Sequence, residues 1–211
     1  MSKSSKKRLL LMITEGPTDE EFYKKVIEIV RKKNNCSKFN FDEIKYMCSN
    51  GIGNMHKNML SKFKFELCED KEYGNYEKIV CFCYDKDVFK QNNTNPPINR
   101  TKMKEDFEKY GANKIIEIIA DNMIEDFFLL DIEGIKKYLK VKKNYKNSSK
   151  KSLELLKQIF KDGSRVYSKG TKAAGLISSL DMPFILGKIC SQIKPLCDEL
   201  GFNCDGTKCI N

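Results

Sequence analysis

Four short apolar runs alternate with segments of helical periodicity along the first 140 residues. The runs cover residues 8–14, 41–47, 78–84 and 114–120, and the first has the composition of a strand buried on both faces. The run over 41–47 is a weaker strand candidate, because it contains Asp42, Glu43 and Lys45. After the first run, apolar residues recur at helical spacing to about Lys33, and Thr18-Asp19-Glu20-Glu21 has the form of a capping box. Alternation of this kind predicts a Rossmann-like α/β fold, with a mainly parallel four-stranded sheet and helices on both faces.

The composition changes near residue 140. From Lys136 to Lys151 there are eight lysines and no acidic residue. Such a stretch is typical either of a solvated linker or of a basic strip that contacts a polyanion. Helical periodicity returns in residues 153–160 and 173–200. We therefore predict an α/β domain over residues 1–140, followed by a basic linker and a small helical C-terminal extension over residues 141–211.

The overall composition is that of a globular protein with an excess of positive charge. Of the 211 residues, 40% are hydrophobic and 32% are charged, and the formal net charge is +10. No apolar run approaches the roughly 18 residues that a membrane span needs, so we expect a cytoplasmic protein without a membrane partner. The charge suits nucleic acid as a partner, although an abundance of lysine throughout the chain explains it equally simply.

The single histidine, His56, limits the kinds of site that the chain can build. It excludes a His-rich zinc centre, and a Ser-His-Asp triad could be formed only with His56. The four C-terminal cysteines lack the C-x-x-C spacing of zinc sites, so we expect thiols there. A metal ion would therefore be held mainly by oxygen, which favours Mg²⁺ or Mn²⁺. His56 itself is expected at the surface near the start of a helix.

Two of the predicted strands end on acidic residues. The first run is followed by Glu15, and the third by Asp85-Lys86-Asp87. Open α/β sheets bind ligands at the carboxyl ends of their strands, so these acids should meet at one edge. In an extended segment Asp85 and Asp87 share a face, whereas Lys86 points the other way. The pattern predicts a Mg²⁺ or Mn²⁺ site in which Glu15 is a bridging ligand or a general base.

Three motifs in this order resemble the TOPRIM family. They are EGPTDEEFY after the first strand, SNGIGN after the second and YDKD after the third. The similarity covers roughly residues 8–139 and is closest to the small stand-alone and OLD-type (overcoming lysogenisation defect) TOPRIM nucleases, some of which act in defence against phage. It implies a metal-dependent nuclease that hydrolyses phosphodiester bonds of DNA or RNA. SNGIGN is also explained by a tight turn before a helix, and we leave open whether it binds phosphate.

The resemblance also implies roles for individual residues. It matches the TOPRIM glutamate to Glu15 and the DxD pair to Asp85 and Asp87, and it adds Asp19 and Glu125 as further metal ligands. Asp19 and Glu125 both lie in the first turn of a predicted helix, where acids are common because of the helix dipole alone.

Two lysines and several partners complete these expectations. Lys169 and Lys172 are candidates for the lysine that OLD-type nucleases place near the scissile phosphate, although both could be ordinary surface residues. The chain shows no ATPase segment, so an ATP-driven step would need a separate ATPase partner; a homodimer is also compatible with the resemblance. The alternative function is a non-catalytic TOPRIM module that binds nucleic acid or protein.

Overall fold

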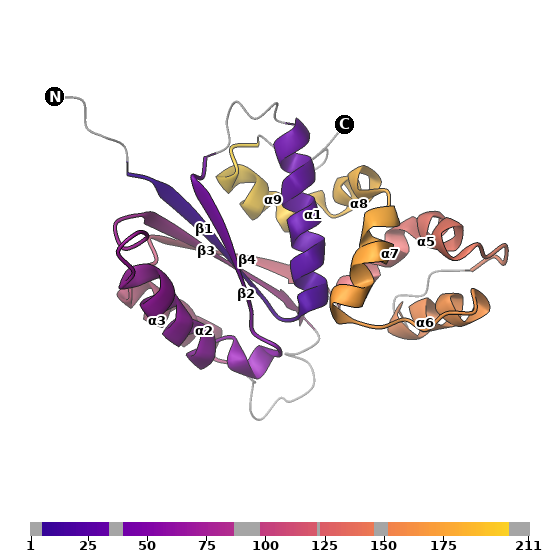
Figure 1. The fold of residues 1–211 in the computed structure, drawn as a ribbon, viewed down its shortest axis with the longest axis horizontal. Coiled ribbons are helices and arrows are strands. Elements are labelled where there is room, and N and C mark those ends of the chain that lie inside the picture. The colour runs from indigo at the N-terminus through magenta and orange to yellow at the C-terminus, as the bar shows by residue number, and fades with distance from the viewer. Residues whose placement is uncertain (1–5, 34–39, 87–97, 122, 146–151, 203–211) are drawn as a thin grey trace.

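A parallel four-stranded sheet forms the centre of the structure (Figure 1). The computed structural model describes residues 6–33, 40–86, 98–121, 123–145 and 152–202. The strands are β1 (Arg8–Thr14), β2 (Glu43–Cys48), β3 (Glu77–Asp85) and β4 (Lys114–Ala120). They lie in the order β2-β1-β3-β4, and every neighbouring pair is parallel. The predicted Rossmann-like α/β sheet is thereby confirmed, with β2 beginning two residues later than the apolar run suggested.

The strand order places a topological switch point between β1 and β3. The chain leaves β1 to form β2 on one side and later returns to form β3 on the other side. In the register of the sheet, Thr14 at the end of β1 pairs with Cys83, and Asp85 at the end of β3 pairs with Ala120. In an open α/β sheet, the crevice outside the strand ends at such a switch point is the expected ligand site.

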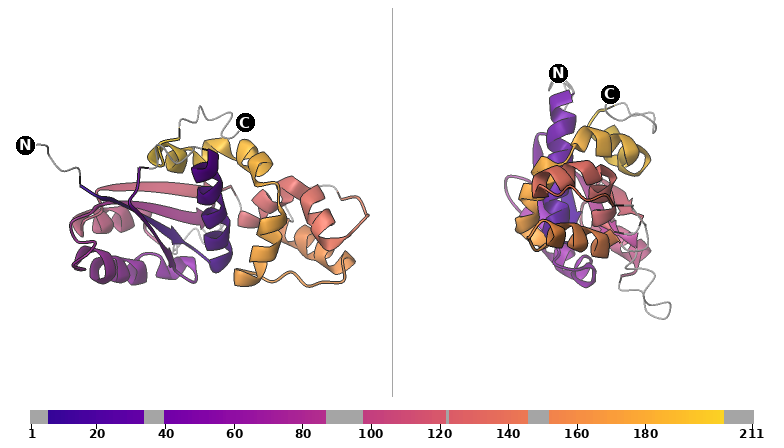
Figure 2. Two further views of the ribbon diagram at one scale, coloured as in Figure 1. Left: turned by 45° about the horizontal axis from the view of Figure 1, so that its top comes forward. Right: turned by 90° about the vertical axis from the view of Figure 1, so that its right-hand side faces the viewer.

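Alternating side chains of the strands build a separate hydrophobic core on each face of the sheet. Leu10 and Met12 of β1 point to the face covered by α1 (Pro17–Lys33) and α9 (Cys190–Glu199). Leu9, Leu11 and Ile13 point to the other face, which α2 (Lys57–Phe63) and α3 (Arg100–Lys109) cover. Figure 2 shows the two layers of helices with the sheet between them. Burial on both faces explains why β1 and β3 are almost continuously apolar, whereas β2 at the edge of the sheet is only partly buried and carries charged residues.

Short helices follow the sheet and fill the rest of the described chain. They are α4 (Ile124–Phe128), α5 (Ile132–Leu139), α6 (Ser152–Asp162), α7 (Ala174–Ser179) and α8 (Met182–Lys188). Helices α5, α6 and α7 form a lobe beside the carboxyl edge of the sheet (Figures 1 and 2). The C-terminal extension is therefore helical, and residues of α6 to α9 share one hydrophobic core with α1. None of the helices in the described ranges is long and apolar enough to cross a membrane.

Three local predictions were wrong. Helix α1 begins at Pro17, so Thr18 is not its cap; the Thr18 hydroxyl instead accepts a hydrogen bond from the backbone N–H of Gly170. His56 does precede the start of α2, but its side chain is only 14% exposed and lies 2.9 Å from Asp106 of α3. Among the C-terminal cysteines, Cys197 is a buried thiol as expected, whereas Cys190 is disulfide-bonded.

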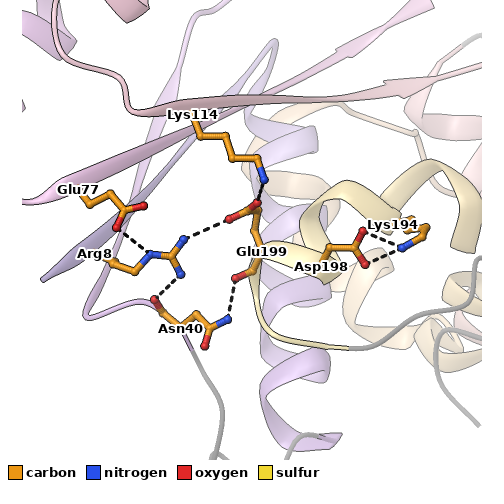
Figure 3. Close-up of polar contacts among 7 residues, drawn as sticks. All are labelled: Arg8, Asn40, Glu77, Lys114, Lys194, Asp198 and Glu199. Carbon is orange, nitrogen blue, oxygen red and sulfur yellow. Dashed lines mark hydrogen bonds and ion pairs between the residues drawn. The ribbon is translucent and has the colours of Figure 1, made fainter. Parts of the chain in front are cut away.

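A group of charged residues ties α9 to the amino ends of the strands (Figure 3). The carboxylate of Glu199 is only 9% exposed and pairs with Arg8 of β1 at 3.2 Å and with Lys114 of β4. Arg8 also contacts Glu77 of β3 at 3.4 Å, and the Asn40 amide donates to the Glu199 carbonyl oxygen at 3.4 Å. These contacts fix the last described helix to the edge of the sheet opposite the switch-point crevice.

Candidate functional site

A cavity of about 440 Å³ lies at the carboxyl ends of β1 and β3. Its walls come from the ends of both strands, the start of α1, the loop after β2, the start of α4 and the segment before α7. The lining residues are Glu15, Gly16, Pro17, Thr18, Asp19, Asn50, Gly51, Asp85, Ile124, Lys169 and Gly170. The switch point of the sheet thus carries a pocket with three of the predicted acids and one of the predicted lysines.

The backbone of Glu15 is held from two sides. Its N–H donates to the carbonyl oxygen of Cys83 at 3.2 Å, which continues the pairing of β1 with β3 by one residue. Its carbonyl oxygen accepts from the Gly51 N–H at 2.9 Å and from the Ser49 hydroxyl at 3.2 Å. Because both neighbours of β1 hold this residue, its side chain starts from a fixed point on the pocket wall.

The loop after β2 forms one wall of the pocket through an unusual backbone conformation. Asn50 has φ 54° and Gly51 has φ 115°, both in the left-handed region. Asparagine tolerates this conformation, and at φ 115° glycine is strongly preferred. The SNGIGN motif therefore supplies the tight turn that we considered, and its position on the pocket keeps the phosphate-binding interpretation open.

Of the predicted DxD pair, the structure places Asp85. It is the last residue of β3 and lines the same pocket as Glu15. Asp87 lies outside the described residues, so its role stays a prediction. Glu15 and an acid from β3 therefore line the same pocket.

Asp19 is a buried acid in the first turn of α1. Its side chain Oδ2 accepts a hydrogen bond from the backbone N–H of Gly16 at 3.1 Å. The pKa of Asp19 is raised to about 7, mainly by burial and also by the negative charges of Glu15 and Glu125, against the lowering effects of the hydrogen bond and Lys169. Because these carboxylates repel one another, the site favours either a bound proton or a bound cation.

Glu125 of α4 is fully buried and holds two donors on one oxygen. The hydroxyl of Tyr167 donates to Glu125 Oε1 at 3.0 Å, and the ammonium of Lys169 lies 3.0 Å from the same atom. Burial lowers the pKa of Lys169, but the charges of Glu125, Asp85 and Asp19 outweigh this effect and raise it overall. Glu125 Oε2 is buried and has no hydrogen-bond partner within the described part of the chain. Sequence reasoning did not assign a role to Tyr167, and its place two residues before Lys169 is the one local signal that pointed to it.

The two candidate lysines differ in position. Lys169 lines the pocket, whereas Lys172 is exposed and is not among the residues that line it. Of these two lysines, Lys169 is therefore the one that lies at the pocket.

The donor chemistry of the pocket suits Mg²⁺ or Mn²⁺, although a closed ligand set is not formed. Within the ranges that the structure describes, no group of three or more His, Cys, Asp or Glu side chains is arranged to hold a metal ion. The pocket offers carboxylate oxygens from Glu15, Asp85 and Asp19, and Mg²⁺ commonly uses one or two carboxylates and keeps several waters. The buried Glu125 Oε2, next to this pocket, is a further oxygen that a water molecule would satisfy.

Comparisons of the chain with models of protein families, with curated proteins and with solved structures found no match. The TOPRIM resemblance thus remains a prediction based on three short motifs. Since one fold supports many activities, the functional argument depends on the pocket and its side chains.

Proposed function

We propose that this protein is a divalent-metal-dependent nuclease with a TOPRIM-like site, acting on the phosphodiester bonds of DNA or RNA. The observation that carries the proposal is the position of Glu15 and Asp85 at the ends of two adjacent parallel strands, on one pocket that also contains Lys169. Acids in this position suit a hard cation, and the lysine adds a positive charge for a phosphate. The net charge of +10 supports a polyanionic substrate.

Each side chain has a role in this proposal. Asp85 would hold Mg²⁺ or Mn²⁺, and Asp87 and Asp19 are further candidate ligands. When bound, the metal would supply charge neutralisation at the phosphate and activation of water. Glu15 would act either as a bridging ligand or as the general base that accepts the proton of the attacking water. The ammonium of Lys169 would stabilise negative charge that develops on the phosphate.

Cleavage assays on single-stranded DNA, double-stranded DNA and RNA with Mg²⁺ or Mn²⁺ test the proposal. Loss of several kcal/mol of transition-state stabilisation in Asp85→Ala should reduce kcat by roughly 10²- to 10³-fold. Glu15→Gln and Asp87→Ala should also lose activity, and Asp198→Asn, at an exposed position of α9, is the matched control. Metal-dependent cleavage that persists in Asp85→Ala and Glu15→Gln would reject the assignment.

A non-catalytic binding module is the second candidate. It is favoured by the lack of a three-acid group among the described residues and by the net positive charge. It requires binding of nucleic acid that weakens steeply with salt, with no turnover under any divalent metal. Fluorescence anisotropy with a labelled oligonucleotide, measured beside the cleavage assay, separates the two functions.

A further inference from the structure

We propose that Glu125 and Tyr167 are positioning residues that hold Lys169 at the pocket, so that a segment of the C-terminal extension completes the site. We call the contacts among Thr18, Glu125, Tyr167, Lys169 and Gly170 the lysine latch. The inference depends on the proposed function, because Lys169 needs a substrate phosphate to act on. It differs from the metal-ligand role that the TOPRIM resemblance implies for Glu125.

The first part of the lysine latch is one shared oxygen atom. The Tyr167 hydroxyl and the Lys169 ammonium both lie 3.0 Å from Glu125 Oε1. Glu125 is fully buried and Tyr167 is 7% exposed, so this hydrogen bond is shielded from water. The ring of Tyr167 also packs edge-on against Phe160 of α6, with 5.2 Å between ring centroids. Tyr167 and Glu125 therefore form a fixed anchor for the ammonium.

The second part fastens the backbone on the other side of Lys169. The N–H of Gly170 donates to the hydroxyl of the buried Thr18 at 2.6 Å. Gly170 has φ 86°, and a Cβ there would lie 3.5 Å from Pro17. The segment is thus attached to two separate elements, α4 through Glu125 and α1 through Thr18. The Thr18 hydroxyl, in the first turn of α1, thus holds a segment that lies 152 residues later in the chain.

The consequence concerns where the ammonium can be found. The Lys169 side chain is 55% exposed, and a lysine with that exposure ordinarily samples many rotamers. The ion pair with the Glu125 carboxylate holds the Lys169 ammonium beside the pocket, which Asp85 also lines. Since Glu125 already pairs with a cation, a second cation on the same carboxylate would be repelled by Lys169. The negative charge of Glu125 therefore serves to position Lys169.

The first experiment compares Tyr167→Phe with Tyr145→Phe in the full chain. Tyr145 also donates to a carboxylate, Asp162 at 2.6 Å, but in a part of the extension that does not line the pocket. Tyr167→Phe should lower kcat for oligonucleotide cleavage by roughly 10- to 100-fold, with KM and the calorimetric Kd for Mn²⁺ unchanged. Glu125→Gln should also leave Mn²⁺ binding unchanged. Wild-type kcat in Tyr167→Phe, or Mn²⁺ binding weakened by Glu125→Gln, would overturn the inference.

The second experiment does not depend on activity. Trypsin cleaves after lysine, and mass spectrometry quantifies the new terminus at Gly170. Tyr167→Phe and Thr18→Val should speed cleavage after Lys169, whereas Tyr145→Phe should cleave at the wild-type rate. Equal rates in all variants would show that no latch exists. Wild-type protein without turnover under any metal would defeat the proposed function, while the trypsin result would still decide on the latch.

Discussion

The backbone N–H of Glu15 donates a hydrogen bond of 3.2 Å to the carbonyl oxygen of Cys83, two residues before Asp85. The bond extends the pairing of β1 with β3 past the last residue of β1. The distance between the Glu15 and Asp85 backbones is therefore set by the pairing of β1 with β3. Sites built on strands keep their geometry better than sites built on loops.

The two candidate lysines should differ in their effect on cleavage. Lys169→Ala removes the cation at the pocket, and loss of one preorganised stabilising group costs roughly 10²- to 10³-fold in kcat. Lys172→Ala removes an exposed charge outside the pocket and should leave kcat within about threefold of wild type. Steady-state cleavage of one oligonucleotide by both variants measures the difference. Equal losses of kcat in the two variants would contradict the prediction. They would mean that the role of a lysine here depends neither on its position relative to the pocket nor on the lysine latch.

Asp19 should make the metal-free protein less stable as the pH rises. Its pKa is about 7 in the folded protein, mainly because of burial, against 3.8 without these influences. The folded state therefore binds the proton more tightly, and stability is lost as the pH increases from about 4 to about 7. The loss at pH 8 is at most roughly 4 kcal/mol.

Thermal unfolding at pH 5 and pH 8 without divalent metal measures this effect. Asp19→Asn keeps an oxygen for the Gly16 N–H and cannot ionise, so its Tm should depend less on pH than that of the wild type. Mn²⁺ added at pH 8 should raise the Tm of the wild type more than that of the variant. The same pH dependence in both proteins would contradict the prediction.

Gly51 and Gly53 offer a matched pair in the loop after β2. Gly51 has φ 115°, where an alanine is strained whatever the space around it, so Gly51→Ala should lower the free energy of unfolding by about 1–2 kcal/mol. Gly53 lies in a short helical turn with no atom within 4 Å of an added Cβ. Gly53→Ala should therefore be neutral or slightly stabilising. Urea denaturation compares the two, and a smaller loss for Gly51→Ala than for Gly53→Ala would refute the argument.

Glu199 and Asp198 are adjacent acids with different surroundings (Figure 3). Glu199→Ala leaves Arg8 and Lys114 without their shared carboxylate, and because both cations are partly exposed we expect a loss of roughly 1–3 kcal/mol. Asp198 forms an exposed pair with Lys194, so Asp198→Ala should change stability by less than about 0.5 kcal/mol. Urea unfolding at low and high salt measures both variants. A similar small effect for both would mean that the contacts of Glu199 add nothing to stability.

The apolar runs predicted the sheet well because strands buried on both faces leave a continuous signal. The positions of β1, β3 and β4 follow from Arg8–Thr14, Glu77–Asp85 and Lys114–Ala120 almost to the residue. The alternation with helices predicted the parallel order, and the acids after the strands predicted where Glu15 and Asp85 would meet. These properties are local in sequence, or they follow from general rules of α/β topology.

Predictions for side chains failed where a distant residue decides the outcome. Thr18 has the sequence context of a cap, but its hydroxyl serves Gly170, which lies 152 residues later in the chain. His56 is partly covered and pairs with Asp106 of another helix, and no local pattern reports that contact. The link between Tyr167 and Glu125 belongs to the same class, since it requires the helical extension to pack beside the sheet.

The hydrogen bond between Gly170 and Thr18 has a consequence for biosynthesis. A chain emerging from the ribosome presents β1 to β4 early, yet the wall that carries Lys169 is supplied only after residue 170 has left the exit tunnel. The sheet and the acids at the ends of β1 and β3 are therefore synthesised before the wall that carries Lys169. The pocket acquires its lysine only in a later part of translation, once the segment around Gly170 can reach Thr18.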